Sequence, residues 1–261
     1  MNIDFIKYSG NGNDFVLIDK RQADISLSLE NIIKICDRRF GIGGDGVILV
    51  DRPKNQENNF SIRIYNCDGS EALMCGNAAR IAIAYEAQRT SESDFLFETK
   101  NSIYKGLFEN GESIIKMSEL FDIDKYDISD LGVLGGLYLN TGVPHTVIET
   151  KNLESFDLMT EGEKIRNDKR FEGGTNVCFF EVVKKGEINF RVYERGIEGE
   201  TFCCGTGVMA TAVTCKELFN WSGEILVHCL GGEVKAQIDS NLKNLFYKGA
   251  VIKCFEGKLK V

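Results

Sequence analysis

The sequence predicts an α+β protein built from two homologous lobes, and three observations support this prediction. The chain has 261 residues, which is enough for two domains of the commonest size, about 100 to 150 residues each. Its second half repeats motifs of its first half in the same order. Short runs rich in Ile, Val, Phe and Tyr are separated by turn residues, as is typical of strands, and four helical patterns stand in matching places of the two halves.

The repeat is clearest around two Cys-Gly pairs. Residues 71–77 (EALMCGN) and 200–206 (ETFCCGT) both carry Glu four positions before Cys-Gly, and both precede a run of small residues with helical character. Other blocks keep the same order at a nearly constant offset, which indicates a duplicated domain. The matched pairs are Asn13 and Val143 (143 − 13 = 130), Gly46 and Asn176 (176 − 46 = 130), Asn66 and Glu194 (194 − 66 = 128), and Cys75 and Cys204 (204 − 75 = 129).

Strand signals account for most of both lobes. Alternation of apolar and polar residues, as in 61–65 and 189–193, predicts half-buried strands. The expected strand regions are 3–8, 14–19, 46–51, 60–66, 94–108, 112–118, 136–149, 177–194, 223–239 and 244–261.

Helical patterns predict two helices in each lobe. They cover 28–39, 75–89, 154–167 and 204–219, with Ser28 as the expected N-cap of the first. The polar, Asp-rich stretch 119–134 predicts the boundary between the lobes. We therefore expect one lobe over 1–125 and the other over 126–249, with 250–261 returning to the first.

Composition excludes several classes of protein. A net charge of −8, with no basic run, argues against a nucleic-acid partner. Apolar stretches are far shorter than the roughly 20 residues of a membrane span, and the N-terminus lacks a signal-peptide pattern, so we expect a cytoplasmic protein. The nine cysteines and two histidines do not show the spacing of a zinc site, so no metal is expected.

The two repeated cysteines predict acid–base chemistry. Each stands just before a helical pattern, where unpaired N–H groups and the helix dipole favour negative charge and lower the pKa of a thiol. The same N–H groups can hold a carboxylate. A carboxylate held between the helix ends that follow Cys75 and Cys204 would place its α-carbon between two thiols. One thiolate then removes the α-proton while the other thiol protonates the opposite face, with no pyridoxal cofactor or metal.

The motifs of this chain resemble those of the diaminopimelate epimerase family over nearly its whole length. The similar stretches are Ser9–Phe15 (SGNGNDF), Cys36–Gly43 (CDRRFGIG), Asn66–Glu71 (NCDGSE), Cys75–Asn77 (CGN), Pro144–His145, Thr175–Val177 (TNV), Tyr193–Gly196 (YERG) and Cys204–Gly207 (CGTG).

The resemblance implies a fold, a reaction and a set of roles. It implies two pseudosymmetric lobes, each a mostly antiparallel barrel-like sheet around a central helix, and a homodimer. The implied substrate is diaminopimelate, interconverted between its LL and meso forms for lysine and peptidoglycan precursor synthesis, with Cys75 and Cys204 as the base and acid pair. The implied contacts to the reacting carboxylate are Gly76, Asn77, Gly205 and Thr206, and the implied pocket residues are Asn13, Asn66, Asn176, Glu194 and Arg195.

Other interpretations stay open. Val143 stands where many family members have Asn, which leaves room for a racemase or epimerase of another amino acid, such as histidine or lanthionine. A non-catalytic amino-acid-binding or thiol redox protein is an alternative of another class. Asn13 and Asn66 can also serve as loop-ending residues. Cys203 is interpreted as a buried spacer, and His145 is given no proton-transfer role. If the two repeated thiols face each other, we expect activity to need a reductant.

Overall fold

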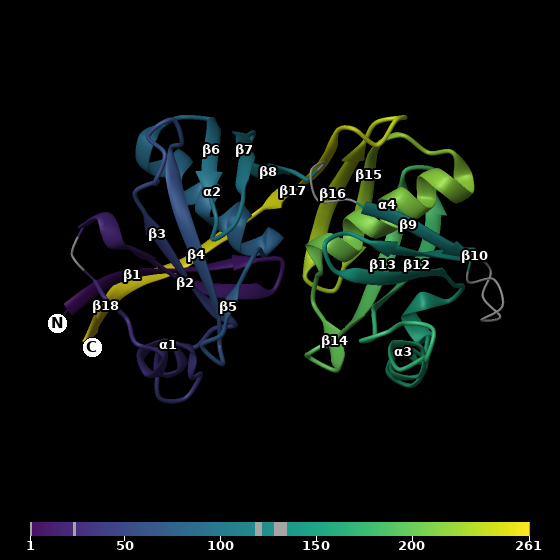
Figure 1. The fold of residues 1–261 in the computed structure, drawn as a ribbon, viewed down its shortest axis with the longest axis horizontal. Helices are drawn as coiled ribbons and strands as arrows, with labels where there is room; N and C mark the ends of the chain where they lie inside the picture. Colours follow the sequence, from purple (N-terminus) through teal and green to yellow (C-terminus); the bar gives the residue numbers. More distant parts are fainter. Residues whose placement is uncertain (1, 23–24, 118–121, 128–134, 261) are drawn as a thin grey trace. The chain divides into compact units, whose positions relative to one another are not determined.

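The computed structural model describes residues 2–22, 25–117, 122–127 and 135–260 (Figure 1). The chain folds into two compact units. The first unit is Met1–Ile115 together with Gly249–Val261, and the second is Lys116–Lys248.

The first unit is dominated by strands that pair in a mixed order. Strand β1 (Asn2–Gly10) lies between β18 (Ile252–Lys260) and β2 (Asn13–Asp19) and is antiparallel to both. Beyond β2 the pairing continues to β3 in parallel, β4 antiparallel, β6 in parallel, then β7 and β8 antiparallel. The short β5 pairs with β4. Their bounds are β3 Gly46–Asp51, β4 Phe60–Asn66, β5 Glu71–Ala72, β6 Asp94–Glu98, β7 Ile103–Glu109 and β8 Glu112–Lys116.

Helix α2 (Gly76–Thr90) is the central helix of the first unit. Every residue from Gly76 to Ala87 is buried, and the helix contacts β1, β2, β3, β4 and β7 (Figure 1). A helix buried on all sides belongs inside its sheet. The amphipathic helix α1 (Leu29–Cys36) lies outside it, with the 3-10 turn η1 (Lys20–Gln22) before it. The predicted N-cap of α1 is confirmed, because Asn31 N–H donates to Ser28 Oγ at 3.2 Å.

The second unit repeats this order of pairing. Strand β10 is antiparallel to β9 and β11, β11 is parallel to β12, and β12 is antiparallel to β13. Strand β13 is parallel to β15 and antiparallel to the short β14. Strand β16 is antiparallel to β15, and β17 is antiparallel to β16. The bounds are β9 Asp122–Asp127, β10 Gly135–Asn140, β11 Pro144–Glu149, β12 Asn176–Lys184, β13 Glu187–Glu194, β14 Gly199–Thr201, β15 Gly223–Cys229, β16 Gly232–Ile238 and β17 Leu245–Ala250.

Helix α4 (Gly205–Phe219) is the central helix of the second unit. It contacts β10, β11, β12 and β16, the counterparts of the strands around α2, and its first eleven residues are almost all buried. Helix α3 (Leu158–Arg166) follows the 3-10 turn η3 (Leu153–Ser155) and packs on β12, β13 and β14. Asp157 caps α3, because its Oδ1 accepts from Thr160 N–H at 3.2 Å.

The duplication extends to individual residue pairs. In the first unit Phe15 pairs with Gly46 across the parallel β2–β3 ladder, and in the second His145 pairs with Asn176 across β11–β12. These pairs keep the offset of 130 that the sequence shows (145 − 15 and 176 − 46). The predicted α+β class with two repeated lobes is confirmed.

One region differs from the prediction. Residues Asp122–Asp127 form β9, although this stretch was predicted as a polar boundary. Its residues pair with β10 through the backbone, as Tyr126 does with Tyr138, and a ladder of N–H and C=O groups does not require an apolar sequence. The flanking residues of the predicted boundary, 118–121 and 128–134, lie outside the described ranges. Among the helices described, none has the length and apolar character needed to cross a membrane.

Candidate active site

Cys75 and Cys204 occupy equivalent backbone positions, the N-caps of the two central helices. Both have extended backbone, with φ −143° and ψ 118° at Cys75 and φ −106° and ψ 109° at Cys204. The first intrahelical bonds are Ala79 N to Cys75 O and Val208 N to Cys204 O, each 2.9 Å. The N–H groups that precede these bonds have no acceptor in the helix, so each cysteine lies beside donors suited to an anion.

In the first unit, the Cys75 thiol contacts a fixed amide. Its Sγ donates to Asn13 Oδ1 at 3.7 Å, and Asn77 Nδ2 donates to the same oxygen at 3.3 Å. The other end of the Asn13 amide donates to Asp45 Oδ2 at 2.8 Å. The same Asp45 oxygen accepts Asp14 N–H at 3.0 Å. Asp45 therefore decides which end of the Asn13 amide faces Cys75.

Charged side chains support Asp45. Lys7 Nζ lies 2.6 Å from Asp14 Oδ2, and Arg38 Nη2 lies 2.6 Å from Asp14 Oδ1 and 2.8 Å from Asp45 Oδ1. Burial by itself raises the pKa of Asp14, but hydrogen bonds from Arg38 and Lys7 outweigh it and lower that pKa to about 2. Asp14 is therefore ionised at neutral pH, and the cluster holds two carboxylates between two cations.

Asn77 is fixed from the opposite side by a buried cation. Arg80 is fully buried and donates to Asn77 Oδ1 at 2.9 Å and to Asn11 Oδ1 at 2.7 Å. It also reaches Ala250 O at 3.2 Å. The Asn77 amide is held at both ends, so its orientation in the first turn of α2 is defined.

In the second unit, a chain of neutral groups leads to Cys204. Cys204 Sγ lies 3.4 Å from Thr206 Oγ1, which lies 3.0 Å from His145 Nε2, and His145 Nδ1 lies 3.5 Å from Cys178 Sγ. Burial, aided by Arg195, lowers the pKa of His145 to about 3, so the ring is neutral at pH 7. Burial also raises the pKa of Cys178 well above its usual range. The Cys178 thiol then donates to Nδ1, and Nε2–H donates to Thr206.

The Cys204 thiol also lies against a carboxylate. Burial raises the pKa of Glu194, and hydrogen bonds from Thr201 and Cys204 partly offset that rise. Burial, followed by Glu194 and Cys178, raises the pKa of Cys204 well above its usual range, although the Thr206 hydroxyl and the Gly207 N–H act in the opposite direction. The expectation that the helix start lowers the pKa of this thiol is wrong, because desolvation and a nearby carboxylate outweigh the helix end.

Three further predicted residues have defined partners. Asn176 donates to Pro144 O at 3.1 Å and accepts Arg195 N–H at 2.9 Å, while Arg195 Nη1 donates to Gly173 O at 3.2 Å. Asn66 is exposed, and its Nδ2 donates to Ser70 Oγ at 2.9 Å. The contact of Asn66 fits a turn-closing role, whereas Asn176 anchors the residue after Glu194.

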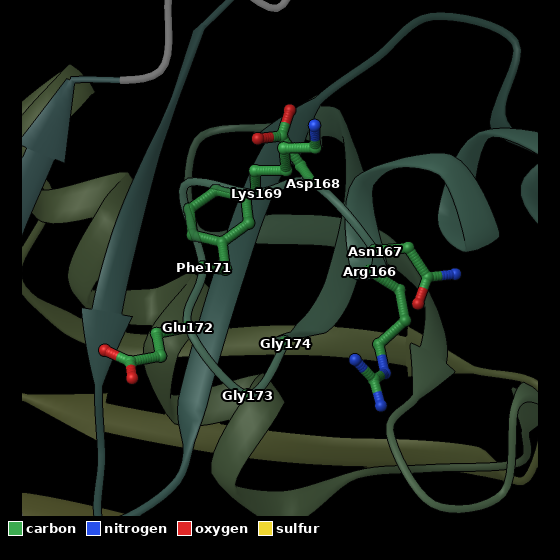
Figure 2. Close-up of a pocket in the computed structure, with 8 residues that line it drawn as sticks. All are labelled: Arg166, Asn167, Asp168, Lys169, Phe171, Glu172, Gly173 and Gly174. Carbon is green, nitrogen blue, oxygen red and sulfur yellow. The ribbon is translucent and has the colours of Figure 1, made fainter.

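A pocket in the second unit lies beside Arg195. It is formed by the loop between α3 and β12, and Figure 2 shows the side chains arranged around it. None of the predicted site residues lines it, but two of its glycines carry the carbonyls that bind Arg195. The lining residues are Arg166, Asn167, Asp168, Lys169, Phe171, Glu172, Gly173 and Gly174.

The sequence did not predict several residues around Cys75 and Cys204. Asp45, Thr201 and Cys178 were not predicted, although each contacts a predicted residue or its partner. For Asp45 a signal existed, because it stands between two glycines in one of the repeated blocks, where the other copy has Thr175. Within the described ranges, no three His, Cys, Asp or Glu side chains are grouped so as to hold a metal ion.

Comparisons with known proteins identify the family of the chain. A family model described as diaminopimelate epimerase matches residues 5–118 and 137–254. The diaminopimelate epimerase of Aquifex aeolicus (strain VF5) is 35% identical, and the match covers 98% of each chain. That of Flavobacterium psychrophilum is 36% identical, over 96% of this chain and 97% of the relative.

Solved structures show the same fold at low sequence identity. A Bacillus anthracis phenazine biosynthesis protein of the PhzF family matches with a TM-score of 0.73 and 15% identity, covering 100% of both chains. A hydroxyproline epimerase from Agrobacterium vitis matches with a TM-score of 0.71 and 10% identity, over 99% of this chain and 92% of that one. These structures show the fold, whereas the family model and the two relatives of 35% and 36% identity show that the chain belongs to the diaminopimelate epimerase family.

Proposed function

We propose that this chain is an amino-acid epimerase that interconverts LL- and meso-diaminopimelate with two cysteines and without pyridoxal phosphate. The observation that carries the proposal is the equivalence of Cys75 and Cys204, each the N-cap of the one central helix of its unit. Membership of the family supports the substrate. A duplicated pair of thiols is what inversion requires, because the proton leaves one face of the α-carbon and returns to the other.

The proposed reaction uses one thiolate and one thiol. The thiolate removes the α-proton as general base, and the thiol protonates the resulting carbanion from the opposite face. General acid–base catalysis of this kind contributes about 10²- to 10⁴-fold for each group. Helix-start N–H groups at Gly76, Asn77, Gly205 and Thr206 are the proposed donors to the reacting carboxylate, where they also stabilise the charge that develops on it.

The distal end of the substrate is assigned to Arg195. A guanidinium presents five N–H donors and binds a carboxylate through two of them at once. Two sets of hydrogen bonds hold Arg195 in place. Its backbone N–H donates to Asn176, and one guanidinium nitrogen, Nη1, donates to the carbonyls of Gly173 and Gly174. Asn13, Asn66, Asn176 and Glu194 are the other proposed pocket residues.

The test is hydrogen–deuterium exchange at Cα in deuterated buffer with reductant. LL-diaminopimelate, histidine and lanthionine are compared on wild type, Cys75→Ser, Cys204→Ser and the control Cys254→Ser, which removes an exposed thiol of β18. We expect exchange with inversion only on diaminopimelate, lost in the first two variants and kept in the control. Inversion of histidine or lanthionine instead would replace the substrate, and the absence of exchange on all three would refute the epimerase.

The proposal also covers the oligomeric state and the cellular compartment. We propose that the enzyme works as a homodimer, as the family resemblance suggests, and in the cytoplasm, because nine free cysteines suit a reducing compartment. Light scattering behind a sizing column measures the mass directly. A mass near that of one 29.2 kDa chain would refute the dimer.

A further inference from the structure

Two thiols outside the proposed catalytic pair lie in contact in the second unit. Cys203 Sγ and Cys229 Sγ are 3.4 Å apart. Cys203 is buried next to the N-cap of α4, and Cys229 is half-buried at the end of β15. A disulfide needs a sulfur–sulfur distance of about 2.05 Å. The two sulfurs therefore have to approach by only about 1.4 Å (3.4 − 2.05).

The backbone around this pair is already joined. Gly231 N–H, in the turn between β15 and β16, donates to Phe202 O at 3.0 Å. Phe202 directly precedes Cys203, and Gly231 lies two residues beyond Cys229. Residues 203 and 229 are thus held side by side by a hydrogen bond between their neighbours, so closing a disulfide does not require a large movement of either segment.

The side chain of Cys203 points away from the proposed chemistry. Consecutive side chains on extended backbone point to opposite sides, and Cys204, the next residue, is extended. Cys203 accordingly contacts Cys229 and, at 3.5 Å, the Tyr247 hydroxyl, whereas Cys204 contacts Thr206. The pair is therefore separate from the proposed catalytic thiols, although the peptide bond joins Cys203 to one of them.

We propose that Cys203 and Cys229 form a reversible disulfide when the protein meets hydrogen peroxide. The Cys229 thiolate attacks peroxide, an S–O bond forms, the O–O bond breaks, and hydroxide leaves with a proton as water. The Cys203 thiolate then attacks the sulfenic sulfur, an S–S bond forms, the S–O bond breaks, and a second water leaves. In total two thiols are oxidised to one disulfide and one peroxide is reduced to two waters.

A disulfide between Cys203 and Cys229 would disturb the start of helix α4. A Cβ on Gly205 would lie 2.9 Å from Tyr247 Cε1, so the Tyr247 ring packs against the first residue of α4. Movement of Cys203 toward Cys229 displaces both its contact with Tyr247 and the peptide that carries Cys204. A misplacement of about 1 Å near reacting groups lowers activity by up to about 100-fold. This loss of activity rests on the proposed function, whereas the formation of the disulfide does not.

The experiment maps the cross-link and measures turnover in the same samples. Wild type, Cys229→Ser and the control Cys254→Ser are treated with a small excess of hydrogen peroxide, alkylated and digested with trypsin. We expect a disulfide between peptides 196–216 and 217–235 in wild type and in Cys254→Ser, absent in Cys229→Ser and after dithiothreitol. Since 196–216 also contains Cys204 and Cys215, the Cys204→Ser variant is mapped as well and should keep the link.

The outcomes separate this inference from the proposed function. A link to Cys203, with up to about 100-fold less turnover in oxidised wild type than in oxidised Cys229→Ser, supports the inference. A wild-type protein that forms the link but never epimerises diaminopimelate supports the thiol pair and refutes the function. Oxidation of other cysteines while Cys203 and Cys229 stay reduced overturns the inference, as does a link made to Cys204 or Cys215 instead.

Discussion

The first unit and the second unit present the same residue, a cysteine at the N-cap of the central helix, in different electrostatic surroundings. Both thiols face an oxygen acceptor. For Cys75 it is the neutral amide oxygen of Asn13, held by a cluster of ion pairs, and for Cys204 it is the carboxylate of Glu194, set among buried groups. A carboxylate favours the protonated thiol far more than an amide does. The difference teaches that duplication conserved the place of the thiol and let its surroundings diverge.

The divergence assigns starting roles within the proposed mechanism. A two-thiol epimerase needs one thiolate and one thiol before substrate binds. Because the pKa of Cys204 lies well above its usual range, Cys204 carries the proton in the resting enzyme. Within the proposed mechanism, the thiol that starts protonated acts as the acid and the other cysteine as the base, and the proton states reverse after each inversion. The comparison predicts that changes at Glu194 and changes at Asp45 act through different thiols.

The largest effect is expected for Glu194→Gln. The change removes the carboxylate that helps to raise the pKa of Cys204, so that pKa falls and the thiol loses part of its preference for the proton. We expect kcat to fall about 100-fold, within the range of a lost acid–base function. In a Cys75→Ser background, iodoacetamide should alkylate Cys204 faster after the change, as measured by mass spectrometry of peptide 196–216.

The matched control is Glu200→Gln. The change again replaces a glutamate carboxylate by an amide close to the site. Glu200, however, pairs with Arg191 at 2.6 Å on the neighbouring strand, whereas Glu194 accepts from Thr201 and Cys204. Alkylation of Cys204 should stay at the wild-type rate in this control. An unchanged alkylation rate in Glu194→Gln would show that Glu194 does not hold the proton on Cys204.

A smaller effect is expected for Asp45→Ala, which acts on the surroundings of Cys75. The Asn13 amide loses its anchor and can rotate, so its oxygen no longer faces Cys75 in a fixed way. A hydrogen bond to a charged group contributes about 1.5–3 kcal/mol, which corresponds to a fall in kcat/KM of about 10- to 100-fold. The control Asp51→Asn removes a carboxylate from the other end of β3, where it pairs with Lys20.

The measurement for Asp45 is a pair of pH–rate profiles. A positioning role predicts that Asp45→Ala changes the profile of kcat/KM, and that Asp45→Asn, which can still accept from Asn13, recovers part of the activity. A fall in activity caused only by loss of folded protein would leave the profile of the surviving enzyme unchanged and would contradict the positioning role.

Much of the fold was predictable because its signals are local. Strand β3 was predicted with its observed bounds, and α2 and α4 were predicted within one residue at each end. Alternation and helical periodicity depend on neighbouring residues, so a single sequence displays them. Strand β9 was not predicted, because it pairs with β10 through backbone hydrogen bonds and its polar sequence lacks the apolar alternation typical of a strand.

The candidate site was predictable where the repeat marked it and not elsewhere. Cys75 and Cys204 stand out because two copies place them at the same point. The raised pKa of Cys204 was not predictable, because it depends on burial and on Glu194, which is ten residues away in the sequence. Asn13 and Asn66 looked alike in the sequence, yet one contacts Cys75 and the other closes a turn with Ser70.

The buried histidine makes the second unit the more acid-sensitive of the two. The pKa of His145 is about 3 in the folded protein against an ordinary value of 6.5, so the unfolded chain binds a proton first as pH falls. Stability from this group is full above pH 6.5 and is lost progressively toward pH 3. At pH 5 the loss is about 2 kcal/mol, from 1.36 kcal/mol for each pH unit. Asp14, with a pKa of about 2, loses its contribution only below about pH 4.

Urea unfolding at pH 7 and pH 5 measures this difference. We expect the free energy of unfolding of wild type to be lower at pH 5 than at pH 7, and that of His145→Gln to fall by about 2 kcal/mol less. Glutamine keeps a donor and an acceptor for Thr206 and Cys178 but does not titrate. An equal fall in both proteins would place the acid sensitivity elsewhere in the molecule.

The last effect concerns stability alone and comes from a difference in packing between the two central helices. Gly207 in α4 corresponds to Ala78 in α2 (207 − 129 = 78). A Cβ at position 207 would lie 2.8 Å from Cys178 Sγ and 3.3 Å from Phe190 Cζ, so Gly207→Ala overpacks the core by one methyl group. The expected loss of stability is about 1–3 kcal/mol, measured by urea unfolding.

The reverse change, Ala78→Gly, should cost about 1 kcal/mol through helix propensity alone. Adding Cys178→Ala to Gly207→Ala removes the clashing sulfur, so the double variant should lose less stability than the two single losses together. If the stability losses of Gly207→Ala and Cys178→Ala were strictly additive, the inference that Gly207 makes room for the Cys178 sulfur would be wrong.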